Sequence, residues 1–171
     1  IFPVIASDEF VEENQASKDM KNLDEAIKTK GFYITEAKPY GGRDDSGAVN
    51  NLTIQNKSDD HMYIMQGDVV SGGNQDRVIA ESMVVPPRTI TDVSVFCVEK
   101  NRWNYQLDEG TEDAEAKKKL YAFSGYYNVA STDLRKTVRT TQNQGQVWAM
   151  VNEITEKNKG FTTSNTYRGL D

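Results

Sequence analysis

Cysteine and histidine are almost absent from this chain: among its 171 residues there is one of each, Cys97 and His61. A single cysteine excludes a disulfide bond within the chain, and the two residues cannot build a Cys/His zinc site or more than one histidine-dependent triad. No stretch approaches the roughly 18 apolar residues that a membrane-spanning helix needs. We therefore expect a soluble domain with Cys97 in the core and His61 on the surface. Asp68, Asp76 and Glu99 could supply oxygen ligands to Mg²⁺, but their spacing is not diagnostic, so no metal site is predicted.

Basic residues are outnumbered by acidic ones, 20 against 26, which gives a formal net charge of −6 at pH 7. This balance argues against a nucleic-acid-binding protein, although a local group of arginines can still bind an anion. The length suits one domain with one core, so we expect residues 1–171 to form a single domain. The first residue is Ile1, which leaves the cellular compartment open because a leader segment would not be visible.

Strand patterns fill the first two thirds of the chain, and helical patterns fill most of the last third. A short helix is predicted over residues 17–30, and strands are predicted at 31–37, 48–56 and 61–67. The last two strands are expected to pair as a hairpin. Two further helices are predicted, one starting at 131 or 132 and one spanning 146–160. This order indicates an α+β fold, with a mostly antiparallel sheet followed by packed C-terminal helices.

The stretch from 67 to 103 carries the polar residues that apolar packing alone would not select. A glycine-rich turn leads into two strand-like runs, which flank the tight turn PPRT at 86–89. Arg77 is roughly ten residues before the centre of that turn and Glu99 roughly eleven after it, so antiparallel pairing brings them nearly level. We therefore predict a site at the open end of this hairpin. Its ligand-binding residues would be Asp68, Gly72, Gly73, Gln75, Arg77, Arg102 and Trp103, with Glu99 as the catalytic residue.

The glycine pair in this stretch has two interpretations. Gly72 and Gly73 allow a close backbone approach, so their turn can present amides to a phosphate. It is not a P-loop, since no Gly-Lys-Ser/Thr follows. The alternative is a glycine bulge between two strands, which needs no ligand.

The charged residues also have two interpretations. Arg77 and Arg102 can clamp a phosphate or carboxylate as bidentate donors, or one of them can pair with Glu99 or Asp68 in a structural salt bridge. Glu99 follows an apolar run, where desolvation favours the neutral acid that proton transfer requires. Trp103 can stack on a nucleobase. Gln75 and the other amides can orient a substrate, or they can tie loops to the backbone.

Five short segments of the sequence resemble those of a bacterial domain family: GDVVSGGNQDRV, VPP, VFCVEKNRW, LRKTV and QGQVW. It is the α+β family named for its association with ADP-ribosylglycohydrolase and rhodanese/phosphatase-like genes. The resemblance covers roughly residues 20–166. The residues that match its pattern are Gly67, Asp68, Gly72, Gln75, Arg77, Cys97, Val98, Glu99, Arg102, Trp103, Gln144 and Trp148.

This chain departs from the family's pattern in two ways. The family often has a glutamate where this chain has Asp68, so the carboxylate here reaches one methylene less far. Family members also continue with a further sheet segment, and the resemblance therefore implies a truncation after Asp171. The function that the resemblance implies is a role beside NAD and ADP-ribose metabolism, inferred from gene neighbourhoods.

Two hypotheses of different classes follow. In the first, the domain binds a phosphorylated or nucleotide-like ligand such as ADP-ribose, and Glu99 moves a proton if the ligand is hydrolysed. In the second, the domain is a non-enzymatic interaction or structural module, and its Gln, Arg, Glu and Trp residues form a buried polar network. A ligand site would leave Arg77, Arg102 and Glu99 lining an open pocket, whereas a network would bury them with their donors satisfied. The cofactor, if there is one, is left open.

Overall fold

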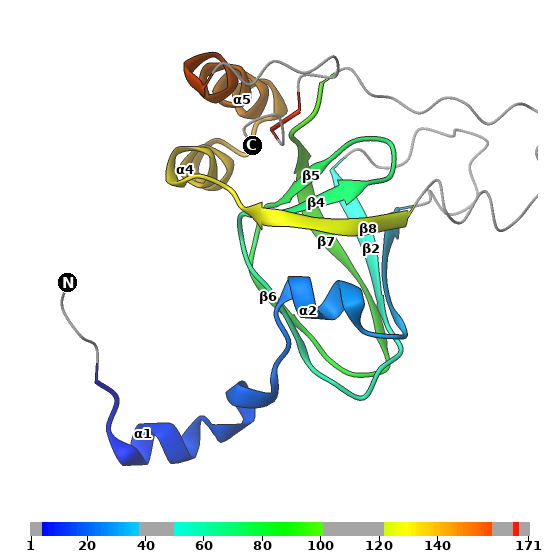
Figure 1. Ribbon diagram of the computed structural model, residues 1–171, viewed down its shortest axis with the longest axis vertical. Coiled ribbons are helices and arrows are strands. Elements are labelled where there is room, and N and C mark those ends of the chain that lie inside the picture. Colours follow the sequence, from blue (N-terminus) through cyan, green and yellow to red (C-terminus); the bar gives the residue numbers. More distant parts are fainter. Residues whose placement is uncertain (1–4, 38–49, 101–121, 159–165, 168–171) are drawn as a thin grey trace, which may run out of the picture.

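The computed structural model describes residues 5–37, 50–100, 122–158 and 166–167, and Figure 1 shows their arrangement. Within these ranges six strands close into an antiparallel barrel in the order β1-β2-β7-β5-β4-β8, and β3 pairs with β6 beside it. The barrel strands are β1 (Phe32–Glu36), β2 (Asn51–Asn56), β4 (Asp68–Gly72), β5 (Arg77–Ile79), β7 (Thr89–Cys97) and β8 (Ala122–Val129). The other elements are β3 (Met62–Ile64), β6 (Met83–Val85), α1 (Asp8–Glu13), the 3₁₀ helix η1 (Gln15–Asp19), α2 (Leu23–Lys28), α4 (Thr132–Thr141) and α5 (Gln144–Asn158).

The barrel interior is filled by the alternate apolar residues of its strands. Leu52 and Ile54 on β2 point inward, and the alternate residues Asn51, Thr53 and Gln55 are exposed or half-buried, as a strand with one core face requires. Helix α2 packs on β1, β8 and β3 and adds Leu23 and Ala26 to this core. Its start is fixed by a capping box in which the Asn22 side chain accepts from the backbone of Glu25.

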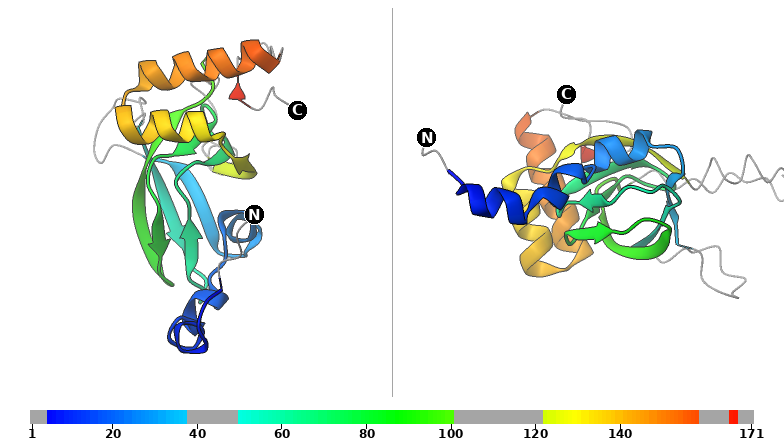
Figure 2. Two further views of the ribbon diagram at one scale, coloured as in Figure 1. Left: turned by 90° about the vertical axis from the view of Figure 1, so that its left-hand side faces the viewer. Right: turned by 90° about the horizontal axis from the view of Figure 1, so that it is seen from below.

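A second core lies between the outside of the barrel and the helices α4 and α5 (Figure 2). Leu134 and Val138 of α4 meet the outward residues of β4 and β5, Val69 and Val78. All three residues of β5 are therefore buried, because both faces of this strand are covered. Since Val78 faces the helices, its neighbour Arg77 points to the barrel side together with Ile79.

The predicted α+β order, with strands first and helices last, is confirmed. The predicted pairing of 48–56 with 61–67 is wrong, because β2 pairs with β1 and β7, and β3 pairs with β6. The buried side chain of Asn56 explains the change. Its amide donates to the backbone carbonyls of Asp60, Val85 and Pro86, which holds the chain after β2 against the turn that follows β6.

The central hairpin is confirmed near its open end, where β5 pairs with β7 and Arg77 lies opposite Cys97, two residues from Glu99. Nearer the turn, the chain leaves the barrel and β6 pairs with β3 instead. The helix predicted over 17–30 is divided into η1 and α2, and residues 8–13 form a helix that the sequence did not predict. Cys97 is buried and His61 is exposed, as expected.

Candidate functional site

Arg77 is fully buried at one end of the barrel, with 0% of its surface exposed. One terminal nitrogen of its guanidinium donates to the backbone oxygen of Gln75 over 2.8 Å, and the other lies 3.5 Å from a carboxylate oxygen of Glu36 on β1. That same oxygen accepts from the backbone N–H of Asn74 over 2.8 Å. The partner of Arg77 is therefore Glu36, which sequence reasoning missed, and neither Glu99 nor Asp68. The Nε of Arg77 is buried without a hydrogen-bond partner.

The neighbouring residues tie the β4–β5 turn to the segment after β7. The amide of Gln75 donates to the backbone oxygens of Glu99 and Lys100 over 2.7 and 3.2 Å. The buried carboxylate of Glu99 accepts from the backbone N–H of Asp76 over 3.1 Å. The carboxylate of Asp76 in turn accepts from the hydroxyl of Thr166 over 2.8 Å. We call this set, with Glu36 and Arg77, the buried polar network.

The glycine pair lies at the edge of this network, and its geometry matches the bulge interpretation. The pairing of β4 with β8 shifts register between Ser71 and Gly72. A Cβ on Gly73 would lie 2.6 Å from the Glu36 carboxylate and 2.5 Å from the Phe123 ring. The N–H of Gly72 donates to Asp76 over 3.3 Å, and the N–H of Gly73 donates to the backbone oxygen of Ala122 over 3.1 Å. Both amides thus have acceptors within the protein.

Asp68 lies at the other end of β4, away from the buried polar network. Its carboxylate accepts from the backbone N–H of Met65 over 2.8 Å and from the hydroxyl of Tyr126 over 3.4 Å. Burial raises the pKa of the Asp68 carboxyl, and the Met65 and Tyr126 hydrogen bonds and the charge of Arg135 oppose this effect. Burial and the charge of Asp68 raise the pKa of Tyr126 to about 12. The structure therefore divides the predicted site into two, while Arg102 and Trp103 lie outside the described residues.

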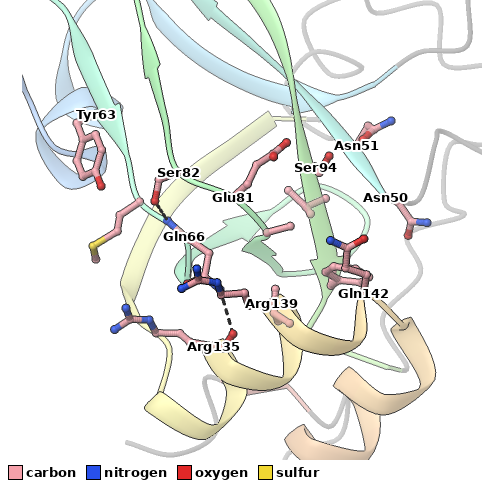
Figure 3. Close-up of a pocket in the computed structure, with 15 residues that line it drawn as sticks. Asn50, Asn51, Tyr63, Gln66, Glu81, Ser82, Ser94, Arg135, Arg139 and Gln142 are labelled. Carbon is pink, nitrogen blue, oxygen red and sulfur yellow. Dashed lines mark hydrogen bonds between the residues drawn. The ribbon is translucent and has the colours of Figure 1, made fainter.

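A polar groove of about 820 Å³ opens between α4 and the barrel (Figure 3). Arg135 and Arg139, one turn apart on α4, form one wall, and Glu81, Ser82 and Ser94 stand on the strand side. The remaining lining residues are Asn50, Asn51, Tyr63, Met65, Gln66, Ala80, Val95, Phe96, Val138 and Gln142. Within the described ranges this groove gathers two cations that sequence reasoning did not assign. The signal for them was an Arg-x-x-x-Arg spacing next to the buried Leu134 and Val138.

The side chain and backbone of Arg135 contact Gln66 and Gly67, at the start of the glycine-rich stretch. A Cβ on Gly67, whose φ is +98°, would lie 2.6 Å from Cγ and 2.7 Å from Cδ of Arg135, so the arginine stem lies directly on this glycine. The amide of Gln66 donates to the backbone oxygen of Arg135 over 3.0 Å. The Nε of Arg135 is buried and has no hydrogen-bond partner. The stem of Arg135 is thus fixed at the edge of the groove by Gly67 and Gln66.

Comparison with known proteins gives one match to a family. Residues 1–170 match the family described as the ARG and Rhodanese-Phosphatase-superfamily-associated Protein domain. The chain belongs to this family. No curated protein and no solved structure matches it.

Two of the residues that match the family's sequence pattern, Gly67 and Gln144, make contacts that hold separate elements together. The glycine of the Gly67–Asp68 pair seats Arg135. Gln144 exchanges two hydrogen bonds of 2.8 Å with the backbone of Cys97, which ties the start of α5 to the end of β7. None of the helices in the described ranges has the length and apolar character that crossing a bilayer requires.

Proposed function

We propose that this domain binds a small phosphorylated or nucleotide-like ligand in the groove between α4 and the barrel. The observation that carries the proposal is the pair of arginines one turn apart on one wall of the groove. A phosphate supplies acceptor oxygens, and arginine binds it through charge-assisted hydrogen bonds. The net charge of the chain is negative, so this cationic wall is a local feature and attracts anions only at short range.

The size and polarity of the groove suit a ligand larger than inorganic phosphate. Its volume of about 820 Å³ falls in the range of pockets that hold nucleotide-sized molecules. Beyond the arginines, Asn50, Asn51 and Gln142 offer amides that can pair with a base or sugar. Glu81 also lines the groove, and a carboxylate there can accept from ribose hydroxyls. If the ligand is hydrolysed, Glu81 is the groove residue able to transfer a proton.

A second candidate function is that of a non-enzymatic interaction module, and the buried polar network favours it. Arg77 and Glu99 are both at most 1% exposed, and they bind neighbouring chain segments. Such a network fixes the β4–β5 turn, β1 and the end of β7 relative to one another. The two functions are compatible, because the groove and the network use different residues.

Isothermal titration calorimetry tests the proposed ligand class. The chain is titrated with ADP-ribose, ADP, AMP, pyrophosphate and inorganic phosphate, and the experiment is repeated with Arg139→Gln. Losing one charge-assisted hydrogen bond costs about 1.5–3 kcal/mol, so the dissociation constant of the bound ligand should rise about 10-fold to 100-fold. Lys136→Gln is the matched control, since this exposed residue lies on the same helix, three residues before Arg139, but does not line the groove. No heat with any ligand, or equal losses in both variants, would refute the proposal.

A further inference from the structure

The N-terminal arm, defined as residues 7–19 with α1 and η1, stands away from the barrel (Figures 1 and 2). Helix α1 buries none of its residues, and its main packing partner is η1. Both figures place α1 at the end of the molecule opposite α4 and α5. A helix of six residues is too short to be stable on its own hydrogen bonds, so a packing surface is expected for it.

The exposed side of α1 combines acid and aromatic character. Four of its six residues are acidic, Asp8, Glu9, Glu12 and Glu13. Glu9 and Glu13 are one turn apart and therefore lie on the same side of the helix. Phe10, next to them on the helix surface, is 58% exposed. This side of α1 thus presents two carboxylates one turn apart beside a phenyl ring.

The groove presents the complementary pattern. Arg135 and Arg139 are also one turn apart on a helix, with the same spacing as the two carboxylates of α1. On the strand side, Tyr63 of β3 pairs across the strands with Val84 of β6, which is outside the groove lining, and the two are 39% and 42% exposed. Tyr63 lines the groove at the end nearer Arg135 (Figure 3). Apolar residues paired across exposed strands offer a contact for a phenyl ring.

We propose that the N-terminal arm of one copy of this chain docks in the groove of a second copy. Helix α1 lies along α4, its two carboxylates face the two arginines, and its phenyl ring packs on the pair formed by Tyr63 and Val84. The exchange is between molecules, because the arm and α4 are at opposite ends of one chain. Two copies related by a two-fold axis exchange both arms and close the assembly. The inference goes beyond the proposed function because it requires no small ligand, although arm and ligand would compete for Arg135 and Arg139.

Sedimentation equilibrium of the whole chain in a phosphate-free, low-salt buffer tests this inference. The wild-type chain should associate into dimers as its concentration rises from micromolar toward millimolar, and added salt should weaken the association because the pairing is partly ionic. Arg139→Glu should weaken association at least tenfold, and so should Glu9→Lys together with Glu13→Lys. Phe10→Ala should also weaken it, without any change of charge. Lys30→Glu, the same charge change at an exposed residue that does not line the groove, should have no effect.

A charge exchange gives the sharpest result. Arg139→Glu is combined in turn with Glu9→Lys and with Glu13→Lys, and one of the two combinations should restore the association that Arg139→Glu removes. That combination also fixes the direction in which α1 lies along α4. A wild-type chain that stays monomeric at all concentrations would overturn the inference, as would a dimer that survives both sets of reversals. Neither result bears on ligand binding, which is measured separately by calorimetry on Arg139→Gln.

Discussion

Replacing Arg77 by methionine tests the assignment of this residue to the buried polar network. Methionine fills a similar volume but leaves the Glu36 carboxylate, which is 6% exposed, with the Asn74 N–H and without the cation beside it. It also removes the donor to the backbone oxygen of Gln75. Removing one partner of a buried ion pair costs about 3–5 kcal/mol, a large part of the 5–15 kcal/mol by which a domain is typically stable. We therefore expect Arg77→Met to lower the free energy of unfolding by about 3–5 kcal/mol.

A double-mutant cycle separates the ion pair from the volume change. Glu36→Gln removes the charge but keeps an oxygen that can accept from the Asn74 N–H. With both substitutions no buried charge is left unpaired. The loss of stability in the double variant should therefore be smaller, by about 1–3 kcal/mol, than the sum of the losses in the two single variants. Urea unfolding at pH 7, with the slope of each transition checked for constancy, measures all four proteins.

The exposed pair of Lys28 and Asp24 provides the control for this cycle. These residues are one helical turn apart on α2, and their charged atoms lie 2.8 Å apart. A surface pair of this kind contributes about 0.2–1 kcal/mol, so Lys28→Met should change stability little. If Arg77→Met lowers the free energy of unfolding by no more than Lys28→Met does, Arg77 does not stabilise the buried polar network. If Arg77→Met also abolished ligand binding, Arg77 would belong to a binding site after all.

Three further predictions concern the groove and the fold. Gly67→Ala should destabilise the chain by about 1–3 kcal/mol, because φ there is +98° and the new Cβ displaces the Arg135 stem. It should also weaken ligand binding, and an unchanged affinity in calorimetry would show that the contact between Gly67 and Arg135 does not position the arginine for the ligand. The folded-state pKa of Asp68 is raised above 3.8, so its contribution to stability falls as pH rises from that value through the folded-state pKa. Urea titrations from pH 3.5 to 7 should therefore show Asp68→Asn gaining on the wild type as pH rises, and a difference that does not change with pH would be inconsistent with the raised pKa. Asn56→Ala should cost about 1–3 kcal/mol by removing the amide that donates to the carbonyls of Asp60 and Pro86 over 2.8 and 3.0 Å, and a thermal melt indistinguishable from wild type would contradict this explanation of the β2 pairing.

The sequence predicted the fold class and much of the strand composition, since alternating apolar residues such as Leu52 and Ile54 record which face is buried. It did not predict the strand partners of β2 and β3. The partner of β2 is decided by barrel closure and by the side-chain bonds of Asn56, which involve residues about thirty positions away. The same limit explains the missed ion pair, because Glu36 and Arg77 are 41 residues apart. The pairing of Arg77 with the end of β7 was predictable because a tight turn fixes the register of a hairpin.

The candidate site was harder to predict because the two ends of the short strand β4 contact different parts of the molecule. Asp68 at the start of β4 follows Gly67, on which the Arg135 stem lies, whereas Gly72 at its end donates to Asp76 of the buried polar network. In the sequence the two ends are four residues apart and look like one cluster. In the barrel they face different neighbours, so their effects should be separable. A change in the network should lower stability and leave the affinity of the folded fraction unaltered, whereas a change at Arg139 should do the reverse.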